Sequence, residues 1–169
     1  RPFYIISDNE YITETGTIYE VEPDYFSIFT VHIINGQRNN LLDEPNQLIL
    51  SKEKKNKYFG TSSALGKTMT FVIDDDEITY TIVAIMDKIP GKSAFLPDFI
   101  VPFDEDKYAN IVGWEYVAYQ IFMSVNPQTD IGLIENKLSG INKKYTDEEE
   151  ERKYILQNLS DIHLGSEKV

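Results

Sequence analysis

The chain has no cysteine among its 169 residues. This absence excludes disulfides, thiol nucleophiles and thiolate metal sites. It is compatible with an oxidising compartment but does not require one. Histidine and tryptophan are also scarce, with only His32, His163 and Trp114. The composition therefore disfavours sites that need cysteine sulfur or several histidines.

Long apolar runs are missing as well. The longest uninterrupted one covers residues 82–86, whereas a membrane-spanning helix needs roughly 20 apolar residues. No signal peptide opens the chain. It begins abruptly with Arg1-Pro2-Phe3, close to strand-like sequence, so we expect it to be a piece of a longer protein.

Basic residues are few, with 16 Lys and Arg against 28 Asp and Glu and a net charge of −12. This excess of negative charge opposes nucleic-acid phosphates and anionic lipid head groups, and we exclude nucleic acid as a partner. The hydrophobic fraction of 41%, with 11 Tyr and 9 Phe, is enough for a core. The length suits one domain or two small lobes.

The first thirty residues predict two strands and a helical turn. Residues 3–6 and 17–21 are aromatic and β-branched, and residues 8–10 break the first strand. Pro23 ends the second strand and opens a turn. The spacing places Tyr25, Phe26 and Phe29 on a common side. We interpret them as core, with an aromatic binding patch as the alternative.

A strand followed by a helix is predicted next. Residues 48–50 form the strand, Ser51 caps a helix over 52–58, and Gly60 suits a left-handed C-terminal residue. Asn35-Gly36 is a turn signal. The helix carries four lysines, which we interpret as a solvated face rather than an anion site. These are Lys52, Lys54, Lys55 and Lys57.

Residues 68–73 and 78–86 predict a hairpin that turns at 74–76. Met69, Phe71 and Ile73 share one face of its first strand, and Ile78, Tyr80 and Ile82 share one face of the second. The acidic turn lacks the alternating oxygen ligands, glycine and distant glutamate of an EF-hand. We therefore predict no calcium site there.

The C-terminal part predicts a split β-α-β unit over residues 116–159. Strands are expected at 99–101, 116–125 and 154–159. Apolar residues at helical spacing predict a helix over 131–145, capped by Thr129 or Asp130. Residues 146–149 match a capping box for a second short helix, so the acidic run 147–151 is a solvated helix start. The long helix must cover one face of the sheet.

No catalytic motif is present. The chain lacks G-x-S-x-G, H-E-x-x-H and G-x-G-x-x-G. Gly60 and Gly66-Lys67 approximate a phosphate loop, but five residues separate the glycines where four are required. No pair of carboxylates stands out. We predict no enzyme activity and no catalytic, cofactor-binding or metal residues, and the residues that bind partners are unknown.

Several segments stand out in order along the chain: 21–29 (VEPDYFSIF), 48–51 (LILS), 57–60 (KYFG), 65–68 (LGKT), 80–90 (YTIVAIMDKIP), the phenylalanine-rich 95–103 and 156–164 (LQNLSDIHL). In this order they resemble the MacB-like periplasmic core domain of ABC transporter permeases in the FtsX-like superfamily. Two departures occur: Ala84 replaces a usual glycine, and Asp87-Lys88 reverses the usual order.

The resemblance implies an α+β, two-lobed periplasmic core domain. Residues 1–30 and 95–164 would form a porter-like β-α-β lobe whose first half is incomplete. Residues 31–94 would form the smaller, β-rich Sabre-like lobe. Residues 165–169 would be a tail toward a membrane helix.

The resemblance also implies a mechanical role. The domain would relay ATP-driven conformational change across the inner membrane, a process called mechanotransmission. The purpose would be export of a substrate or lipoprotein, or regulation of a periplasmic partner. Its partners would be its own transmembrane helices, a cytoplasmic ATPase, a second permease copy and a periplasmic adaptor or cargo. The resemblance transfers no catalytic residue.

Two other hypotheses remain open from the residues. One is a free-standing periplasmic binding or adaptor module. The other is a hydrolase whose site assembles in space from His32 or His163, a serine and an acid.

Overall fold

The computed structural model describes residues 2–7, 10–73, 76–87, 97–108, 119–145 and 153–161. The chain divides into two compact units, Arg1–Ile111 and Val112–Val169, and each is described by itself. The division into a porter-like lobe (1–30 and 95–164) and a Sabre-like lobe (31–94) stays a prediction.

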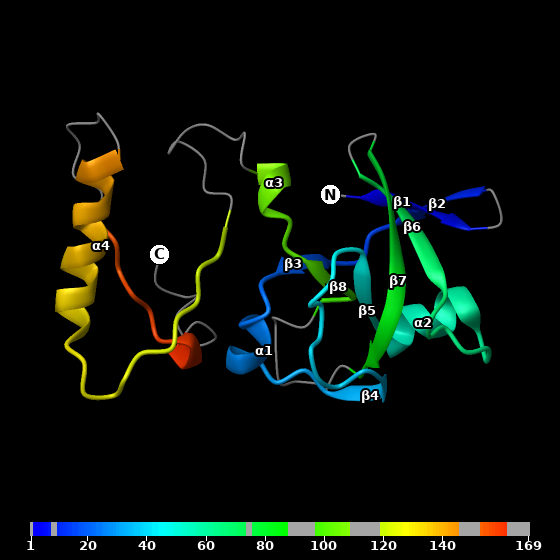
Figure 1. Ribbon diagram of the computed structural model, residues 1–169, viewed down its shortest axis with the longest axis horizontal. Coiled ribbons are helices and arrows are strands. Elements are labelled where there is room, and N and C mark those ends of the chain that lie inside the picture. The colour runs from blue at the N-terminus through cyan, green and yellow to red at the C-terminus, as the bar shows by residue number, and fades with distance from the viewer. Residues whose placement is uncertain are drawn as a thin grey trace. The chain divides into compact units, whose positions relative to one another are not determined.

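The first unit is built on one mixed sheet with the strand order β2-β1-β6-β7-β5-β8-β3, and β4 pairs with β7 beside this path (Figure 1). The strands are β1 (Phe3–Ser7), β2 (Glu10–Glu14), β3 (Ile18–Val21), β4 (Ile33–Gly36), β5 (Gln47–Ser51), β6 (Thr68–Ile73), β7 (Asp76–Met86) and β8 (Phe99–Pro102). Its helices are α1 (Tyr25–Ile28), α2 (Lys52–Phe59) and α3 (Glu105–Tyr108).

Most of the predicted elements of this unit are confirmed. The strands at 3–6, 17–21, 48–50 and 99–101, the 68–86 hairpin and the turn after Pro23 are all present. Ser51 caps α2, because its side chain accepts a hydrogen bond from the Lys54 amide. Gly60 has the predicted positive φ of 55°, but its ψ of −125° lies outside the left-handed helical region.

Two predictions of secondary structure fail in this unit. Glu10 does not lie in a break after β1 but begins β2, which pairs antiparallel with β1. The sequence of β2 has little apolar alternation, so the strand forms because it pairs with β1. Asn35-Gly36 is not a turn but the end of β4. Gly36 is needed there, because a Cβ would lie 2.4 Å from the Val83 carbonyl oxygen and φ is +92°.

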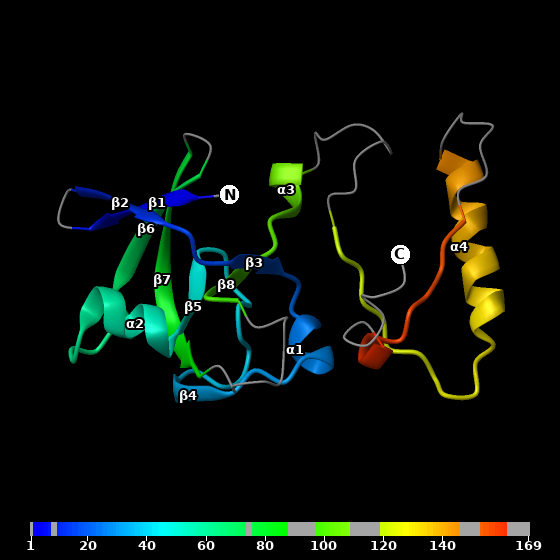
Figure 2. The same ribbon diagram turned by 180° about the vertical axis from the view of Figure 1, so that it is seen from behind.

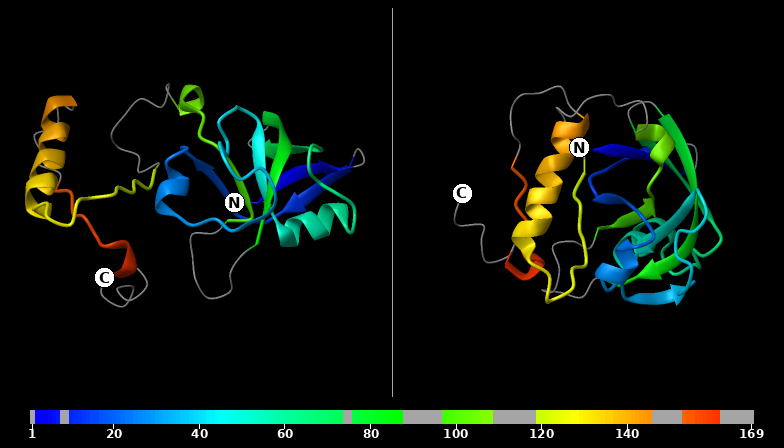
Figure 3. Two further views of the ribbon diagram at one scale, coloured as in Figure 1. Left: turned by 60° about the horizontal axis from the view of Figure 1, so that its bottom comes forward. Right: turned by 60° about the vertical axis from the view of Figure 1, so that its left-hand side comes forward.

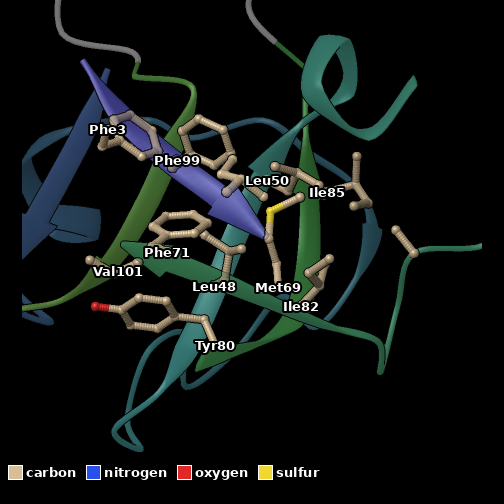
Figure 4. Packing of buried hydrophobic residues seen from close by; sticks show 12 residues of the cluster. Phe3, Leu48, Leu50, Met69, Phe71, Tyr80, Ile82, Ile85, Phe99 and Val101 are labelled. Atoms are coloured by element: carbon tan, nitrogen blue, oxygen red, sulfur yellow. The ribbon is translucent and has the colours of Figure 1, made fainter. Parts of the chain in front are cut away.

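The core lies on both faces of the sheet. One cluster includes Phe3, Leu48, Leu50, Met69, Phe71, Tyr80, Ile82, Phe99 and Val101 (Figure 4). The other includes Val21, Ile33, Leu41, Leu42, Ile49, Ala84, Met86 and Ile100. A register shift in the β5–β7 pairing leaves Val83 unmatched. This bulge moves the side chains that follow it to the other face, so Ile82 and Ala84 lie in different clusters.

The predicted core roles are confirmed for the hairpin faces and for the aromatic turn. Ile73 and Ile78 pack against the first cluster. Tyr25 and Phe26 pack against the second, and the rings of Tyr25 and Phe29 stack with centroids 4.7 Å apart. Helix α2 lies along one side of the sheet (Figures 2 and 3), where Tyr58 and Phe59 reach the first cluster.

The second unit contains the predicted long helix, α4 (Ile131–Tyr145). Asp130 caps it, because its Oδ1 accepts the Gly132 amide at 2.9 Å. Neither neighbouring strand forms. Residues 119–125 and 153–158 are assigned to no strand, and a short 3₁₀ helix covers Leu159–Asp161. The rest of the first predicted strand (116–118) and the predicted capping box at 146–149 lie outside the described residues.

The second strand prediction fails because the backbone bonds to side chains of α4 instead of to a neighbouring strand. The Leu156 amide donates to Glu135 Oε1 at 2.8 Å, and the Tyr154 amide lies 3.4 Å from Ser139 Oγ. Residues 119–125 are likewise assigned to no strand. In the part of the chain that the structure describes, no helix is long and apolar enough to cross a membrane.

Candidate functional site

Helix α2 turns one of its lysines inward. Lys54 is only 9% exposed, although we predicted that all four lysines of this helix form a solvated face. That prediction is wrong for Lys54, because α2 packs against the sheet and its cap at Ser51 fixes the first turn. A buried ammonium needs a partner, and the partner is Glu14.

Glu14 ends β2 and is 1% exposed. Its Oε1 accepts from Lys54 Nζ at 2.8 Å and from the amides of Thr15 and Gly16 at 2.8 and 2.9 Å. Its Oε2 accepts from Lys57 Nζ at 2.8 Å and from Tyr58 Oη at 2.6 Å. Five donors therefore converge on one carboxylate.

A second buried acid completes the arrangement. Asp98 precedes β8 and its Oδ2 accepts the Thr17 amide at 3.1 Å, while Lys54 Nζ lies 4.0 Å from it. Gly16 lies close to both, since a Cβ there would be 2.9 Å from Asp98 Oδ2 and 3.0 Å from the Lys54 Cε. We call Glu14, Lys54, Lys57, Tyr58 and Asp98 the Glu14 cluster. It joins β2, α2 and the start of β8.

The electrostatics of the Glu14 cluster oppose acid–base catalysis. Burial alone raises the pKa of Glu14, but the hydrogen bonds from Lys54, Lys57, Tyr58 and Gly16 outweigh burial and hold that pKa far below its usual range. Burial and the adjacent Glu14 carboxylate raise the pKa of Tyr58. A general base must be able to take up a proton near the working pH. Glu14 cannot, so this cluster is a structural connection.

We did not predict this cluster from the sequence. Lys54 and Glu14 are 40 residues apart, and neither belongs to a motif with defined spacing. One signal was available. Lys54 lies in the first turn of a helix that directly follows β5, whose residues 48–50 are apolar, and a helix in that position must pack against the sheet.

A cavity of about 600 Å³ opens elsewhere in the first unit. Among the residues that the structure describes, its charged lining consists of seven acids and one lysine: Glu20, Glu22, Asp43, Glu44, Asp104, Glu105, Asp106 and Lys107. Its apolar lining consists of Val21, Pro23, Leu42, Pro45, Ile78, Tyr80, Pro102 and Phe103. We call this cavity the acidic groove. No site residue had been predicted here, because the lining comes from four separate segments.

Leu42 is the most unusual residue of the acidic groove. It is 3% exposed and has a φ of 61°, a left-handed conformation that costs roughly 1–2 kcal/mol for a residue with a Cβ. Its burial in the second core cluster offsets this cost. The loop that carries Asp43 and Glu44 is thereby anchored to the core.

The structure describes one of the two histidines that were considered for a hydrolase site. His32 is exposed, and His163 lies outside the described residues. Within the described ranges, no group of three His, Cys, Asp or Glu residues is close enough to hold a metal ion. Of the acidic turn at 74–76, only Asp76 is described.

The family model of the MacB-like periplasmic core domain matches residues 3–141, which is most of the chain. The chain therefore belongs to this family, and it is an extracytoplasmic domain of a MacB- and FtsX-like ABC transporter permease. The resemblance predicted from the sequence motifs is confirmed.

Solved structures agree on the fold. A domain assigned to a permease protein from Porphyromonas gingivalis has 18% identity and a TM-score of 0.59, over 96% of this chain and 77% of that one. The periplasmic region of MacB from Actinobacillus actinomycetemcomitans has 12% identity and a TM-score of 0.62, over 100% of this chain and 73% of that one. The predicted α+β class is confirmed. A comparison with curated protein sequences found no match.

Proposed function

We propose that this domain relays ATP-driven conformational change across the inner membrane. The change would serve export of a substrate or lipoprotein, or regulation of a periplasmic partner. In this proposal the domain works with its own membrane helices, a cytoplasmic ATPase and a second copy of the permease. A displacement of the porter-like lobe (1–30 with 95–164) would be transmitted to the Sabre-like lobe (31–94), and the reverse.

The observation that carries the proposal is the Glu14 cluster. It fastens the edge strand β2 to α2 through bonds of 2.6–2.8 Å and links α2 toward β8 through Lys54 and Asp98. Close-packed interiors of this kind resist continuous deformation. A displacement applied to one edge of such a body therefore moves the whole body, as a relay requires.

The test uses the full-length permease, assembled with its ATPase in lipid nanodiscs. Because the domain has no cysteine, Glu10→Cys and Glu53→Cys introduce its only labelling sites for spin-label distance measurement. Both positions are exposed. One sample carries both labels within a single copy, and a second carries Glu53→Cys in each copy of a dimer.

The expected result is a distance within one copy that does not change between ATP-bound and nucleotide-free states, together with a distance between copies that does change. If the distance between copies is the same in the ATP-bound and nucleotide-free states, the proposed relay is contradicted. A changed distance within one copy would contradict the rigid body that the proposal assumes.

A further inference from the structure

We propose that the acidic groove binds a basic, amphipathic peptide segment of a partner protein outside the membrane. This goes beyond the relay proposed above, because it assigns a binding surface that exists whether or not the domain moves. Three properties of the groove support it: its apolar floor, its one-sided charge and the spacing of its carboxylates.

The floor of the groove is apolar and already fixed. Tyr80 and Leu42 are 8% and 3% exposed and belong to the two core clusters, so ligand binding does not have to order them. Half-buried Pro102 and Phe103 add further apolar surface. A preformed apolar floor favours ligands that bring aliphatic side chains to it.

The described part of the rim carries charge of mainly one sign. Among the described residues, seven acids and one base line the groove. That base, Lys107, is paired with Glu20 at 2.7 Å. The net negative charge of the described rim therefore attracts a cationic partner and repels a second copy of this acidic chain.

The carboxylates are spread along the rim and do not converge on one point. No three of them, among the residues that the structure covers, are placed to hold a metal ion. Separate carboxylates match cations that are spaced along a polypeptide better than a single ion. In a peptide where lysines alternate with aliphatic residues, the lysines would pair with the rim carboxylates while the aliphatic side chains pack on the apolar floor.

The experiment measures binding of dye-labelled peptides to the whole 169-residue chain by fluorescence anisotropy. The first peptide combines lysine and leucine, the second replaces leucine by serine, and the third replaces lysine by glutamate. We expect saturable binding of the lysine–leucine peptide that weakens as salt screens the charges. The other two peptides should bind at least about tenfold more weakly.

A triple variant tests the location. Glu22→Gln, Asp43→Asn and Glu44→Gln remove three exposed groove charges and should weaken binding about tenfold. The matched control, Glu10→Gln with Glu53→Gln and Asp76→Asn, removes three exposed charges outside the groove and should leave affinity within about twofold. Equal losses in both triple variants would show non-specific charge attraction and overturn the proposal.

Mapping on the unaltered chain keeps the proposal falsifiable if a variant does not fold. Amide chemical shifts on adding the lysine–leucine peptide should change at residues 42–46, 78–80 and 102–107. Changes confined to other residues would overturn it. Sedimentation is the remaining check: self-association that the groove variant abolishes would assign the groove to a second copy instead.

Discussion

At the residue scale, the burial of Glu14 decides what this carboxylate can do. Both of its oxygens are occupied, by two amides and one ammonium on Oε1 and by an ammonium and a phenol on Oε2. An ionised carboxylate so fully bonded is stable without solvent. Lys54, with its side chain 11% exposed, depends on it in turn. Without Glu14, the buried Lys54 ammonium loses its partner at 2.8 Å and keeps Asp98 at 4.0 Å. Without Lys54, the Glu14 carboxylate keeps its ion pair with Lys57 at 2.8 Å.

Replacement of Glu14 by glutamine should therefore destabilise the domain strongly. The loss of one partner of a buried ion pair costs about 3–5 kcal/mol, because Lys54 keeps its charge in a dry site. Urea unfolding followed by circular dichroism measures the change. Glu10→Gln, at the exposed start of the same strand, is the control and should stay within about 0.5 kcal/mol of the parent. Similar stabilities for the two variants would contradict the structural role of Glu14.

The same carboxylate should make stability depend on pH. The folded-state pKa of Glu14 is lowered from a reference value of 4.5, so below that value the unfolded chain binds a proton that the folded chain does not. Stability from this group is thus fully present above about pH 4.5 and is lost as pH falls toward the folded pKa.

The free-energy difference between the parent and Glu14→Gln measures this dependence. It should be constant from about pH 7 to about pH 6 and shrink steadily below about pH 4.5. Unfolding curves at each pH give the difference directly, because other carboxylates contribute equally to both proteins. A difference that grows on acidification would show that Glu14 is protonated in the folded state.

At the element scale, sequence patterns predicted the elements whose own residues carry a local apolar pattern. The β6–β7 hairpin and α4 have strong periodicity, and each side chain of β5 from Leu48 to Leu50 is fully buried. The predictions failed for β2 and for 153–158. There the conformation depends on the group that the backbone bonds to, which is β1 for β2 and the Glu135 side chain for Leu156. Partners distant in sequence leave no local pattern, which is also why the Glu14 cluster and the acidic groove were missed.

The segment 153–158 provides a prediction of its own. Its Leu156 amide bonds to Glu135 Oε1, so Glu135→Ala should free that amide while Glu135→Gln keeps an acceptor oxygen in place. Amide hydrogen exchange at Leu156 should accelerate by about fivefold to tenfold in the alanine variant, matching a lost bond of about 1 kcal/mol. The glutamine variant should exchange close to the parent rate. Equal acceleration in both variants would show that charge, not the hydrogen bond, holds the segment.

At the scale of the whole first unit, one aromatic group links strands that are far apart in sequence. Phe71 of β6 is fully buried and packs against Phe3 of β1, Tyr80 of β7 and Phe99 of β8, with ring centroids 5.2–5.5 Å apart. These rings therefore give β1, β6, β7 and β8 a shared core on this face of the sheet. Such a body should open as one cooperative unit, which is the property that the proposed relay uses.

Phe71→Leu tests this cooperativity. The loss of aromatic packing should lower the free energy of unfolding by about 1–2 kcal/mol, and native-state hydrogen exchange should show the same loss at Ile5 in β1 and at Ile100 in β8. Tyr4→Leu is the matched control, because Tyr4 follows Phe3 in β1 but is 47% exposed. Its replacement should change the free energy of unfolding by less than about 0.5 kcal/mol. Loss of protection in β1 alone would mean that the edge of the sheet opens independently of β8. A displacement at that edge would then be absorbed before it crossed the sheet, and the domain could not act as a rigid relay.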